Sequence, residues 1–538
     1  MSRLIYLLIL LFLWNPAWSH AAPTAQTGTP QNKKSTQKWN QNSTNNNAKP
    51  ANRGIKTAQG NNKKLTGKPR RAHRPPGANQ TAALPQTPRP LDESSRIGYL
   101  LMDMQSGAIL ETQHDTEPFI PASVAKVPST LAALHILGPD HRFVTSLQSA
   151  APVVNGVVQG DLILVGGGDP SFNMAGLTEL AHQLRNRGIH RIAGRFLFDE
   201  SALVPQASIS QEQNDEETYN SGLSALTLDP SRIRMRWMID RQGRLLTQTT
   251  PNLNHISYVL GPASTKGPSL IFLGGDRKEQ WQLNPRNARS GWDWVPIKKP
   301  GRLSALALQE FSHQLGITLP EPEPGAAPAH ATLLASHSSA PLQELARYAL
   351  EHSNNLWTEM IGGMAARKLS GQPQTTASAA KILSEWTFKQ LPQVDWSNFY
   401  LANSSGLSSQ SRITPRQMAA ILLLANSVPI GDRPYAALLP VSGWKGTLAG
   451  RFTGPNSKYR VWAKTGTVLY GKALAGYLYT KQNRRLVFAI FVSDVEQRKI
   501  LDANKGQNGY GELNRGKIWN QRAVTHINAL VERWLRTH

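Results

Sequence analysis

The sequence predicts an α/β protein of the α+β kind, in which an antiparallel sheet flanked by helices is interrupted by a large, mostly β insertion. Three observations predict this architecture. A strand–turn–strand pattern begins near residue 97, three further strands and a helix end the chain, and a stretch of short strands separates two helical regions. We therefore expect 91–140 and 336–538 to form one discontinuous domain and 141–335 to form one or two inserted domains.

The first 21 residues have the pattern of a secretory signal peptide. One positive charge, Arg3, precedes an apolar run from Leu4 to Trp14, and small residues follow up to Ala21. The run is too short to span a bilayer, which requires about 20 apolar residues. We expect residues 1–21 to be cleaved and the protein to be exported to the periplasm or another extracytoplasmic space, with an uncleaved anchor as the alternative.

Residues 22–90 differ from the rest of the chain in composition. They hold 13 Lys and Arg residues and no Asp or Glu, in a background of Asn, Gln, Thr and Pro. Such a segment cannot bury enough apolar surface to offset its ordering entropy, so we expect a disordered basic linker. It is either a solubilising tether or an arm that holds the protein electrostatically on an anionic cell wall or membrane surface.

The composition also argues against several kinds of site. The chain has no cysteine, which excludes a disulfide framework and every thiolate metal site. Its 14 histidines show no zinc-ligand spacing, so neither a metal nor another cofactor is expected. We expect no nucleic-acid partner either, because the protein is predicted to be exported and shows no basic–aromatic recognition pattern.

Regular structure is expected from about residue 96. Residues 97–104 and 108–112 form a hairpin, and a helix follows Pro121. Pro128 lies inside that helix, where it removes a backbone donor and can kink the axis. Apolar residues at helical spacing, or runs typical of strands, predict helices at 342–349, 356–369 and 519–535, and strands at 461–468, 473–480 and 486–492.

Ser123 and Lys126 form the candidate reactive pair. They lie three residues apart on one helical turn, so their side chains share a face. Serine is a weak nucleophile until a base removes its proton, and a neutral lysine can be that base. Keeping a lysine neutral at pH 7 costs about 4–5 kcal/mol, which burial and a neighbouring cation could supply.

Two further motifs follow Ser123 along the chain. Ser353-Asn354-Asn355 comes just after a predicted helix, and Lys464-Thr465-Gly466 lies on a predicted strand. Ser-x-x-Lys also occurs at Ser35, Ser378 and Ser442, so the pair alone would prove little. We interpret Ser378 as a helix cap and the Ser442/Lys445 pair as part of a solvent-facing loop. Three motifs in this order, each on its expected element, are typical of penicillin-binding proteins and class A β-lactamases.

Over about residues 92–535 the chain resembles the class C low-molecular-mass penicillin-binding proteins, the D-alanyl-D-alanine carboxypeptidase/endopeptidase family of the penicillin-binding protein 4 type (peptidase family S13). The long interval between the first two motifs fits the large insertion of that family. The resemblance also rests on four shorter matches: 160–170 (Gly-Asp-Leu and Gly-Gly-Gly-Asp-Pro), 219–226, 405–408 and 464–467. It implies a β-lactamase/transpeptidase-like domain that binds peptidoglycan stem peptides and is acylated by β-lactam antibiotics.

The resemblance also implies the catalytic roles. Ser123 would attack the carbonyl between two terminal D-alanines, and Lys126 would accept its proton. Ser353 would relay a proton to the leaving amine, Asn355 would hold the peptide and steady Lys126, and Lys464 would add positive charge.

Substrate-binding residues follow from the same resemblance. Thr465, Gly466 and Thr467 would hold the terminal carboxylate, with the backbone N–H of Thr467 completing an oxyanion hole with that of Ser123. Asp199, in a Gly194-x-x-x-x-Asp199-x-Ser201 match, would pair with the cationic end of the third residue of the stem. A turn residue at the end of a strand is the alternative interpretation of Asp199. The sequence has Asn403-Ser404 where the family usually has Asp-Gly, and we interpret the loop that follows at 405–408 as mainly structural.

The predicted function is a serine-type D-alanyl-D-alanine carboxypeptidase, with endopeptidase action on peptidoglycan cross-links as a possible second activity. Two alternatives remain from the sequence: a β-lactamase-like hydrolase, which must release the acyl group quickly, and a non-catalytic homologue that only binds cell wall. The intact motif residues favour an enzyme.

Overall fold

The computed structural model describes residues 90–538 except 230, 252–254, 264–266, 287, 428, 506–507 and 509. The predicted signal peptide and nearly all of the predicted linker lie outside these residues. No helix in the described part of the chain is both long and apolar enough to cross a membrane.

The main sheet joins the beginning of the described chain to its end. Five antiparallel strands lie in the order β17-β18-β19-β1-β2, so that β1 pairs along its whole length with β19. The bounds are β1 Arg96–Asp103, β2 Ile109–Gln113, β17 Val461–Val468, β18 Gly471–Tyr479 and β19 Arg485–Ser493. The hairpin and the three C-terminal strands predicted from the sequence therefore belong to one sheet, as the α+β fold class requires.

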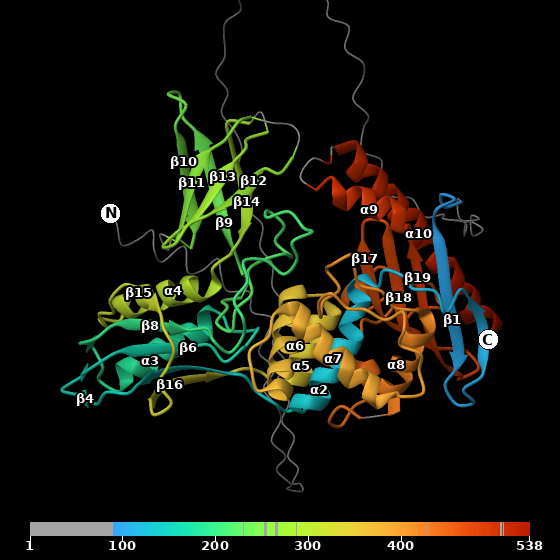
Figure 1. Cartoon of the computed structure of the whole chain (residues 1–538), viewed down its shortest axis with the longest axis horizontal. Helices are drawn as coiled ribbons and strands as arrows, with labels where there is room; N and C mark the ends of the chain where they lie inside the picture. The colour runs from blue at the N-terminus through green and yellow to red at the C-terminus, as the bar shows by residue number, and fades with distance from the viewer. Residues whose placement is uncertain are drawn as a thin grey trace, which may run out of the picture. The chain divides into compact units, whose positions relative to one another are not determined.

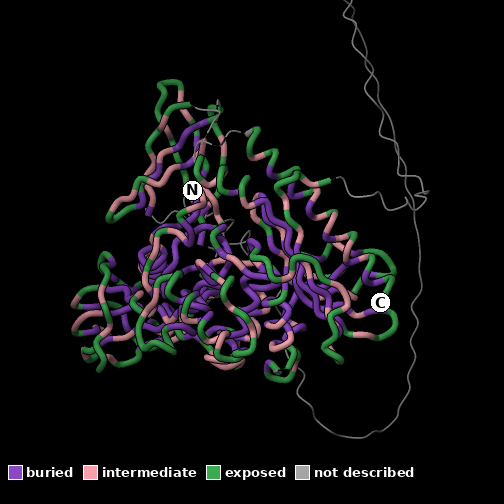
Figure 2. The backbone as a smooth tube through the Cα atoms, turned by 45° about the vertical axis from the view of Figure 1, so that its right-hand side comes forward, coloured by how far each residue is buried: buried purple, intermediate pink, exposed green. Residues whose placement is uncertain are grey.

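Helices cover both faces of this sheet (Figure 1). On one face, the long C-terminal helix α10 packs Trp519, Ile527 and Trp534 against Leu474 and other strand residues. On the other face, alternate residues of β18 and β19 pack against a helical layer. The helices are α2 Lys126–Leu137, α5 Leu342–Glu351, α6 Asn355–Ser370, α7 Thr376–Gln390, α8 Pro415–Ser427, α9 Val495–Ala503 and α10 Tyr510–Thr537, with short 3-10 turns η2 Tyr435–Leu438 and η3 Gly446–Leu448. The strands β18 and β19 are consequently almost wholly buried (Figure 2).

The chain between α2 and α5 builds a second five-stranded sheet, in the order β15-β8-β6-β3-β16, covered by two helices. Its members are β3 Val144–Ser149, β6 Leu162–Val165, β8 Phe196–Asp199, β15 Pro322–Pro324, β16 Thr332–Ser338, α3 Met174–Asn186 and α4 Pro300–Gln314. A small sheet of β4 Val153–Val154, β5 Val157–Val158 and β7 Arg191–Ile192 adjoins it along the chain. The glycines at 166–168 follow β6 without forming a turn themselves, the turn lies at Pro170 and Ser171, and no Gly-Lys-Ser/Thr phosphate motif follows them.

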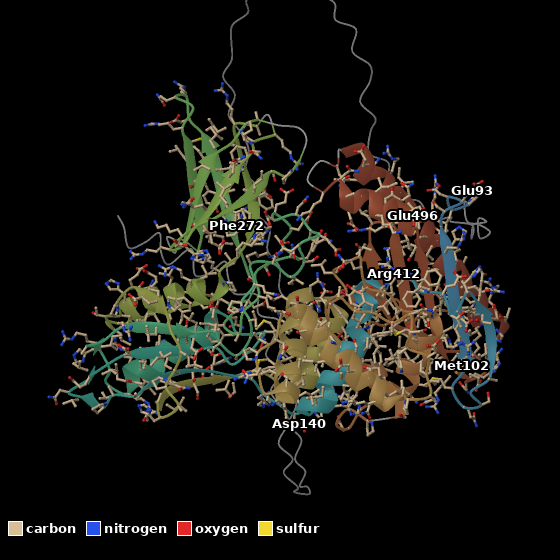
Figure 3. All side chains as sticks on the ribbon, viewed as in Figure 1. Glu93, Met102, Asp140, Phe272, Arg412 and Glu496 are labelled. Atoms are coloured by element: carbon tan, nitrogen blue, oxygen red, sulfur yellow. The ribbon has the colours of Figure 1, made fainter. Side chains whose placement is uncertain are left out.

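Two three-stranded sheets complete this region. One has the order β10-β9-β14 and the other β11-β13-β12, and a shared core includes Met235, Trp281 and Val295. The bounds are β9 Arg232–Ile239, β10 Leu245–Thr250, β11 Ile256–Leu260, β12 Leu270–Gly274, β13 Glu279–Leu283 and β14 Ser290–Pro296. Phe272, labelled in Figure 3, contributes its ring to this core, with its centroid 5.3 Å from that of Trp281.

Pro128 does not disrupt the helix that carries it, because α2 begins close to this proline. Residues Ala122–Ala125 form a 3-10 turn, η1, and α2 begins only at Lys126. Pro128 therefore lies in the first turn of α2, where backbone N–H groups have no partner within the helix. The missing donor costs the helix no hydrogen bond.

Candidate active site

Ser123 lies on the η1 turn at the edge of a cleft of about 520 Å³. The preceding residue, Ala122, has φ +45, a left-handed conformation that costs a non-glycine residue about 1–2 kcal/mol. The Ser123 side chain is only partly buried and lines the cleft together with Ser353, Asn355 and Thr467. Backbone strain beside a partly accessible hydroxyl is typical of a functional position.

Lys126 is fully buried and its amine contacts three oxygens. Nζ lies 3.0 Å from Ser123 Oγ, 2.7 Å from Asn355 Oδ1 and 2.7 Å from the Ser405 carbonyl oxygen. Two of these oxygens can only accept. A neutral amine has two hydrogens and one lone pair, so it can donate to Asn355 and Ser405 and accept from the Ser123 hydroxyl.

Burial lowers the pKa of Lys126 from 10.5 to about 7, while the Glu359 carboxylate acts in the opposite direction. A pKa near 7 leaves a large fraction of the amine neutral at physiological pH. The geometry and the pKa together fit Lys126 as the acceptor of the Ser123 proton.

Glu359 fixes the position of the backbone segment that contacts Lys126. It lies one helical turn after Asn355 on α6, and its carboxylate accepts hydrogen bonds from Ser405 N at 2.7 Å and Ser404 N at 3.1 Å. It is fully buried, and burial raises its pKa. By fixing the backbone at 404–405, it orients the carbonyl that accepts a hydrogen bond from Lys126. The loop that we interpreted as mainly structural therefore also supplies a direct contact to the buried lysine.

The Ser353-Asn354-Asn355 motif forms the junction between α5 and α6. Ser353 has φ +55, and Asn354 is the N-cap of α6, its side chain accepting from Trp357 N at 3.1 Å. Asn355 is the first residue of α6, which directs its amide toward Lys126. Its Nδ2 donates to the carbonyl of Tyr219 at 3.1 Å, so a segment of the inserted region closes one side of the site.

Lys464 also lies in the site, on the central part of β17. Its Nζ donates to Ser353 Oγ at 2.9 Å and to the Thr465 carbonyl at 2.9 Å, and the side chain is fully buried. Burial and the nearby Lys126 charge lower its pKa well below 10.5. The five predicted residues thus form two hydrogen-bonded groups, with Ser123, Lys126 and Asn355 in one and Ser353 and Lys464 in the other.

The three residues predicted to bind the substrate carboxylate, Thr465, Gly466 and Thr467, have different surroundings in the structure. Thr467 lines the cleft, and its hydroxyl accepts from Lys472 Nζ at 2.6 Å. Thr465 instead donates to Thr447 Oγ1 at 2.8 Å. A Cβ on Gly466 would lie 2.5 Å from the Pro121 carbonyl, so this glycine allows β17 to approach the turn that carries Ser123.

Lys472 was not identified from the sequence. It lies opposite Thr467 on β18, and burial lowers its pKa to about 8. No local motif marks it, because its position beside Thr467 arises from strand pairing.

Asp199 lies at the end of β8, and both of its carboxylate oxygens are occupied. They accept from Ser201 N at 2.9 Å and Ala327 N at 2.8 Å, and the residue is buried. It is not among the residues that line the Ser123 cleft. This geometry favours the alternative interpretation of Asp199 as a turn residue, and its contact with substrate stays a prediction.

The inserted region also supplies one wall of the cleft. Glu212, Glu216, Glu217 and Tyr219 line it, and Glu212 accepts a hydrogen bond from Ser409 N, which follows the 405–408 loop, at 2.7 Å. Within the described residues, no group of three or more His, Asp or Glu side chains could hold a metal ion.

Two of the other Ser-x-x-Lys matches lie within the described residues, and both interpretations were wrong in detail. Thr375, not Ser378, is the N-cap of α7, and its side chain accepts from Ser378 N. Ser442 is buried and donates to the Ser457 carbonyl at 2.7 Å, while Lys445 pairs with Glu351. Neither pair forms a second reactive site.

Comparison with known proteins gives a consistent result. Residues 82–510 match the model of the D-Ala-D-Ala carboxypeptidase 3 (S13) family. A D-alanyl-D-alanine carboxypeptidase of Actinomadura sp. (strain R39) is 27% identical over 414 residues, covering 72% of this chain and 76% of the relative. The D-alanyl-D-alanine carboxypeptidase DacB of Haemophilus influenzae is 23% identical over 423 residues, covering 75% of this chain and 86% of the relative.

Among solved structures, the crystal structure of penicillin binding protein 4 from Haemophilus influenzae superimposes with a TM-score of 0.66 at 22% sequence identity. The match covers 75% of this chain and 92% of that one. It shows a shared penicillin-binding-protein fold, in agreement with the predicted fold class. Because the family model spans most of the chain, the protein belongs to the D-Ala-D-Ala carboxypeptidase 3 (S13) family.

Proposed function

We propose that this protein is a serine-type D-alanyl-D-alanine carboxypeptidase that trims peptidoglycan stem peptides through an acyl-enzyme. The observation that carries the proposal is the Lys126 amine, buried, with a pKa near 7 and 3.0 Å from Ser123 Oγ. Membership of the S13 family supports the same reaction.

In the first step, Ser123 Oγ attacks the carbonyl between the two terminal D-alanines, and its proton passes to Lys126 Nζ. The N–H groups of Ser123 and Thr467 would stabilise the oxyanion; such donors are worth about 10²–10³-fold each. The terminal D-alanine leaves as its amine receives a proton through Ser353, which Lys464 holds at 2.9 Å. Water then hydrolyses the ester, and Lys126 again serves as base.

The terminal carboxylate of the stem would lie near Thr467 and Thr465. Lys464 and Lys472 place their amines beside these residues, and a bound carboxylate would favour the protonated form of each amine. The same acylation would cleave a D-alanyl cross-link, in which the leaving amine belongs to a neighbouring stem, so endopeptidase action is part of the proposal. A β-lactam carbonyl would acylate Ser123 in the same way. The related Haemophilus influenzae structure has been solved with a β-lactam bound.

This substrate requires an extracytoplasmic location. The composition of residues 1–21 and of the basic segment 22–90 supports export followed by electrostatic retention on the cell wall or membrane surface. Deletion of 22–90 should abolish salt-sensitive sedimentation of the protein with cell-wall fragments. Equal sedimentation with and without the segment at low salt would favour the simple tether.

The test compares wild type with Ser123→Ala and, as a matched control, Ser378→Ala from an unrelated Ser-x-x-Lys sequence. Each protein is treated with fluorescent penicillin and with a pentapeptide stem, and released D-alanine is measured. Wild type and Ser378→Ala should be labelled and active, whereas Ser123→Ala should lose labelling and at least about 10³-fold in release.

Equal labelling of Ser123→Ala would contradict the nucleophile assignment. Rapid turnover of nitrocefin without D-alanine release would instead favour the β-lactamase alternative. Wall binding by a wild-type protein that shows neither labelling nor release would favour a non-catalytic homologue.

A further inference from the structure

The outer face of the β10-β9-β14 sheet carries an unusual set of side chains. On β9, alternate residues point inward to the core and outward to solvent, and the outward series contains three arginines. The neighbouring β14 presents two exposed tryptophans on the same face, paired in register with these arginines. We call Arg232, Arg234, Arg236, Trp292 and Trp294 the Arg/Trp face.

The arginines and tryptophans interleave. The guanidinium carbon of Arg232 lies 4.8 Å from the Trp294 ring centroid, and that of Arg234 lies 4.9 Å from the Trp292 centroid. Trp292 remains 57% exposed and Trp294 38% exposed, so the indoles keep accessible surface. Met238 and Leu246, each nearly half exposed, extend the apolar part of the same face at one end.

The Arg/Trp face is strongly positive. None of the outward residues that the register gives to β9, β10 and β14 is acidic. Among the described residues no ion pair involves these three arginines, and Arg234 Nε is a buried donor without a hydrogen-bond partner. One carboxylate, that of Asp229, lines the same cavity as Arg232 and interacts with it electrostatically. Three cations beside two open indoles suit a ligand that alternates carboxylates with flat apolar surfaces.

The face also leads to the candidate active site. Arg232, at the start of β9, lines a cavity of about 320 Å³ together with Ser353 and Asn355. From there β9 runs outward, and at about 3.4 Å per residue Arg236 lies about 14 Å further along the strand. A polymer that follows the face would therefore have one end at the catalytic motif.

We propose that the Arg/Trp face binds the glycan strand of peptidoglycan while a stem branching from that strand occupies the Ser123 cleft. Sugar rings would place their C–H surfaces on Trp292 and Trp294. Carboxylates of neighbouring stems would pair with the guanidinium groups. The proposal rests on the proposed function, because that function makes peptidoglycan the substrate polymer.

Binding is tested with the full-length chain carrying Ser123→Ala, so that the polymer is not consumed. Cosedimentation with purified insoluble peptidoglycan is measured for this protein and for two variants of the face, Trp292→Ala/Trp294→Ala and Arg232→Gln/Arg234→Gln/Arg236→Gln. The matched control is Lys368→Gln/Lys389→Gln/Lys481→Gln, which removes the same charge from exposed positions elsewhere and keeps residues 22–90 intact. Both face variants should bind about tenfold more weakly, and the control should bind as the parent does.

The ligand class is tested by three additional probes. Glycan strands stripped of their stems still carry lactyl carboxylates and should compete for binding. Neutral chitin should compete more weakly, because it lacks carboxylates. Single-stranded DNA that competes better than the glycan strands, with the same loss in the face variants, would overturn the proposal in favour of a nucleic-acid surface.

A second assay separates this proposal from the proposed function. In chains with an intact Ser123, Trp292→Ala/Trp294→Ala and Arg234→Gln/Arg236→Gln, which keep the Arg232 beside Ser353, should hydrolyse a soluble pentapeptide within about twofold of wild type. They should release D-alanine about tenfold more slowly from insoluble peptidoglycan. Failure of wild type to release D-alanine at all would refute the function while leaving the sedimentation result to decide the binding. Unchanged sedimentation by both face variants, with melting temperatures like that of wild type, would refute the Arg/Trp face proposal. The tryptophan and arginine variants are chemically different, so the test remains valid if one of them fails to fold.

Discussion

Lys126 combines burial with three oxygen neighbours, and this combination defines its chemistry. A permanently charged amine at this position would carry a desolvation penalty that the Glu359 carboxylate offsets only in part. A neutral amine satisfies the same three neighbours with two donated bonds and one accepted bond. The site thus favours the protonation state that the reaction needs.

The first prediction concerns pH. Because burial lowers the pKa of Lys126 to about 7, the rate of acylation by penicillin should rise through a midpoint near pH 7 and fall about tenfold per unit at lower pH. Stopped-flow acylation between pH 5 and 9 measures this limb. A rate that does not change across this range would contradict Lys126 as the base.

The same pKa has a consequence for stability. Between pH 10.5 and about 7 the unfolded chain binds the Lys126 proton more tightly than the folded protein does. The contribution of this residue to the free energy of unfolding therefore decreases as the pH falls through that window, and it is constant below it. The active site is maintained at a cost in stability.

The second prediction concerns Glu359. Its carboxylate raises the pKa of Lys126, so Glu359→Gln should lower that pKa further and move the rising limb of the acylation profile to lower pH. Glu385→Gln, an exposed substitution on α7, is the control and should leave the midpoint unchanged. A midpoint that moves to higher pH would contradict the inference that Glu359 raises the pKa of Lys126.

At the scale of elements, the site depends on the close approach of a loop, a strand and a turn. Gly406 has φ +70, and a Cβ there would lie 1.9 Å from the Ala122 carbonyl. Gly466 permits a similar approach of β17 to η1. Glycines at these two positions let backbone segments meet where side chains would separate them.

The third prediction follows from that contact. Gly406→Ala should destabilise the protein by about 1–3 kcal/mol and reduce acylation, because the Ser405 carbonyl would move away from Lys126. Gly450→Ala is the control, since the methyl group that it adds meets no other part of the protein within 4 Å, and its effect should stay within about 0.5 kcal/mol. Denaturant unfolding and penicillin labelling provide the two measurements, and a Gly406→Ala protein with unchanged labelling would contradict the argument.

At the scale of the whole molecule, the two three-stranded sheets formed by β9 to β14 have a separate hydrophobic core and a buried carboxylate, Glu279. The Glu279 carboxylate is fully buried and accepts from Lys298 N at 2.8 Å, Lys299 N at 2.6 Å and Trp281 Nε1 at 3.2 Å. It also lies 3.0 Å from His255 Nε2. This cluster ties β13 to the segment that connects β14 with α4.

The fourth prediction is that Glu279→Ala should destabilise this region by about 3–5 kcal/mol, because it leaves several buried donors unpaired. The core around Trp281 shares no residue with the cores beside Ser123, so penicillin labelling at low temperature should persist. Thermal unfolding followed by tryptophan fluorescence measures the change, with the exposed Glu310→Ala as control. Equal melting temperatures for the two variants would refute the structural role of Glu279.

Much of the fold and of the candidate site could be predicted from the sequence, because these features depend on residues that are close together in the chain. The order of the three motifs, the proline before Ser123 and the periodicity of the flanking strands and helices depend on neighbouring residues. They predicted the fold class and named five side chains that the structure places in two hydrogen-bonded groups. Ser123, Lys126 and Asn355 form one group, and Ser353 and Lys464 form the other.

Other features depend on pairing between distant segments, which a sequence does not display. The Ser405 carbonyl, Glu359 and Lys472 reach the site only after the chain has folded, and the arginines of β9 meet the tryptophans of β14 only through strand register. Asp199 shows the converse, since its motif suggested a ligand contact while the fold directs its carboxylate to two backbone N–H groups. The sequence by itself determined which chemical groups and which secondary structures were available. Only the tertiary structure decided which groups are buried together, and burial is what lowers the pKa of Lys126 toward the neutral form that the proposed reaction needs.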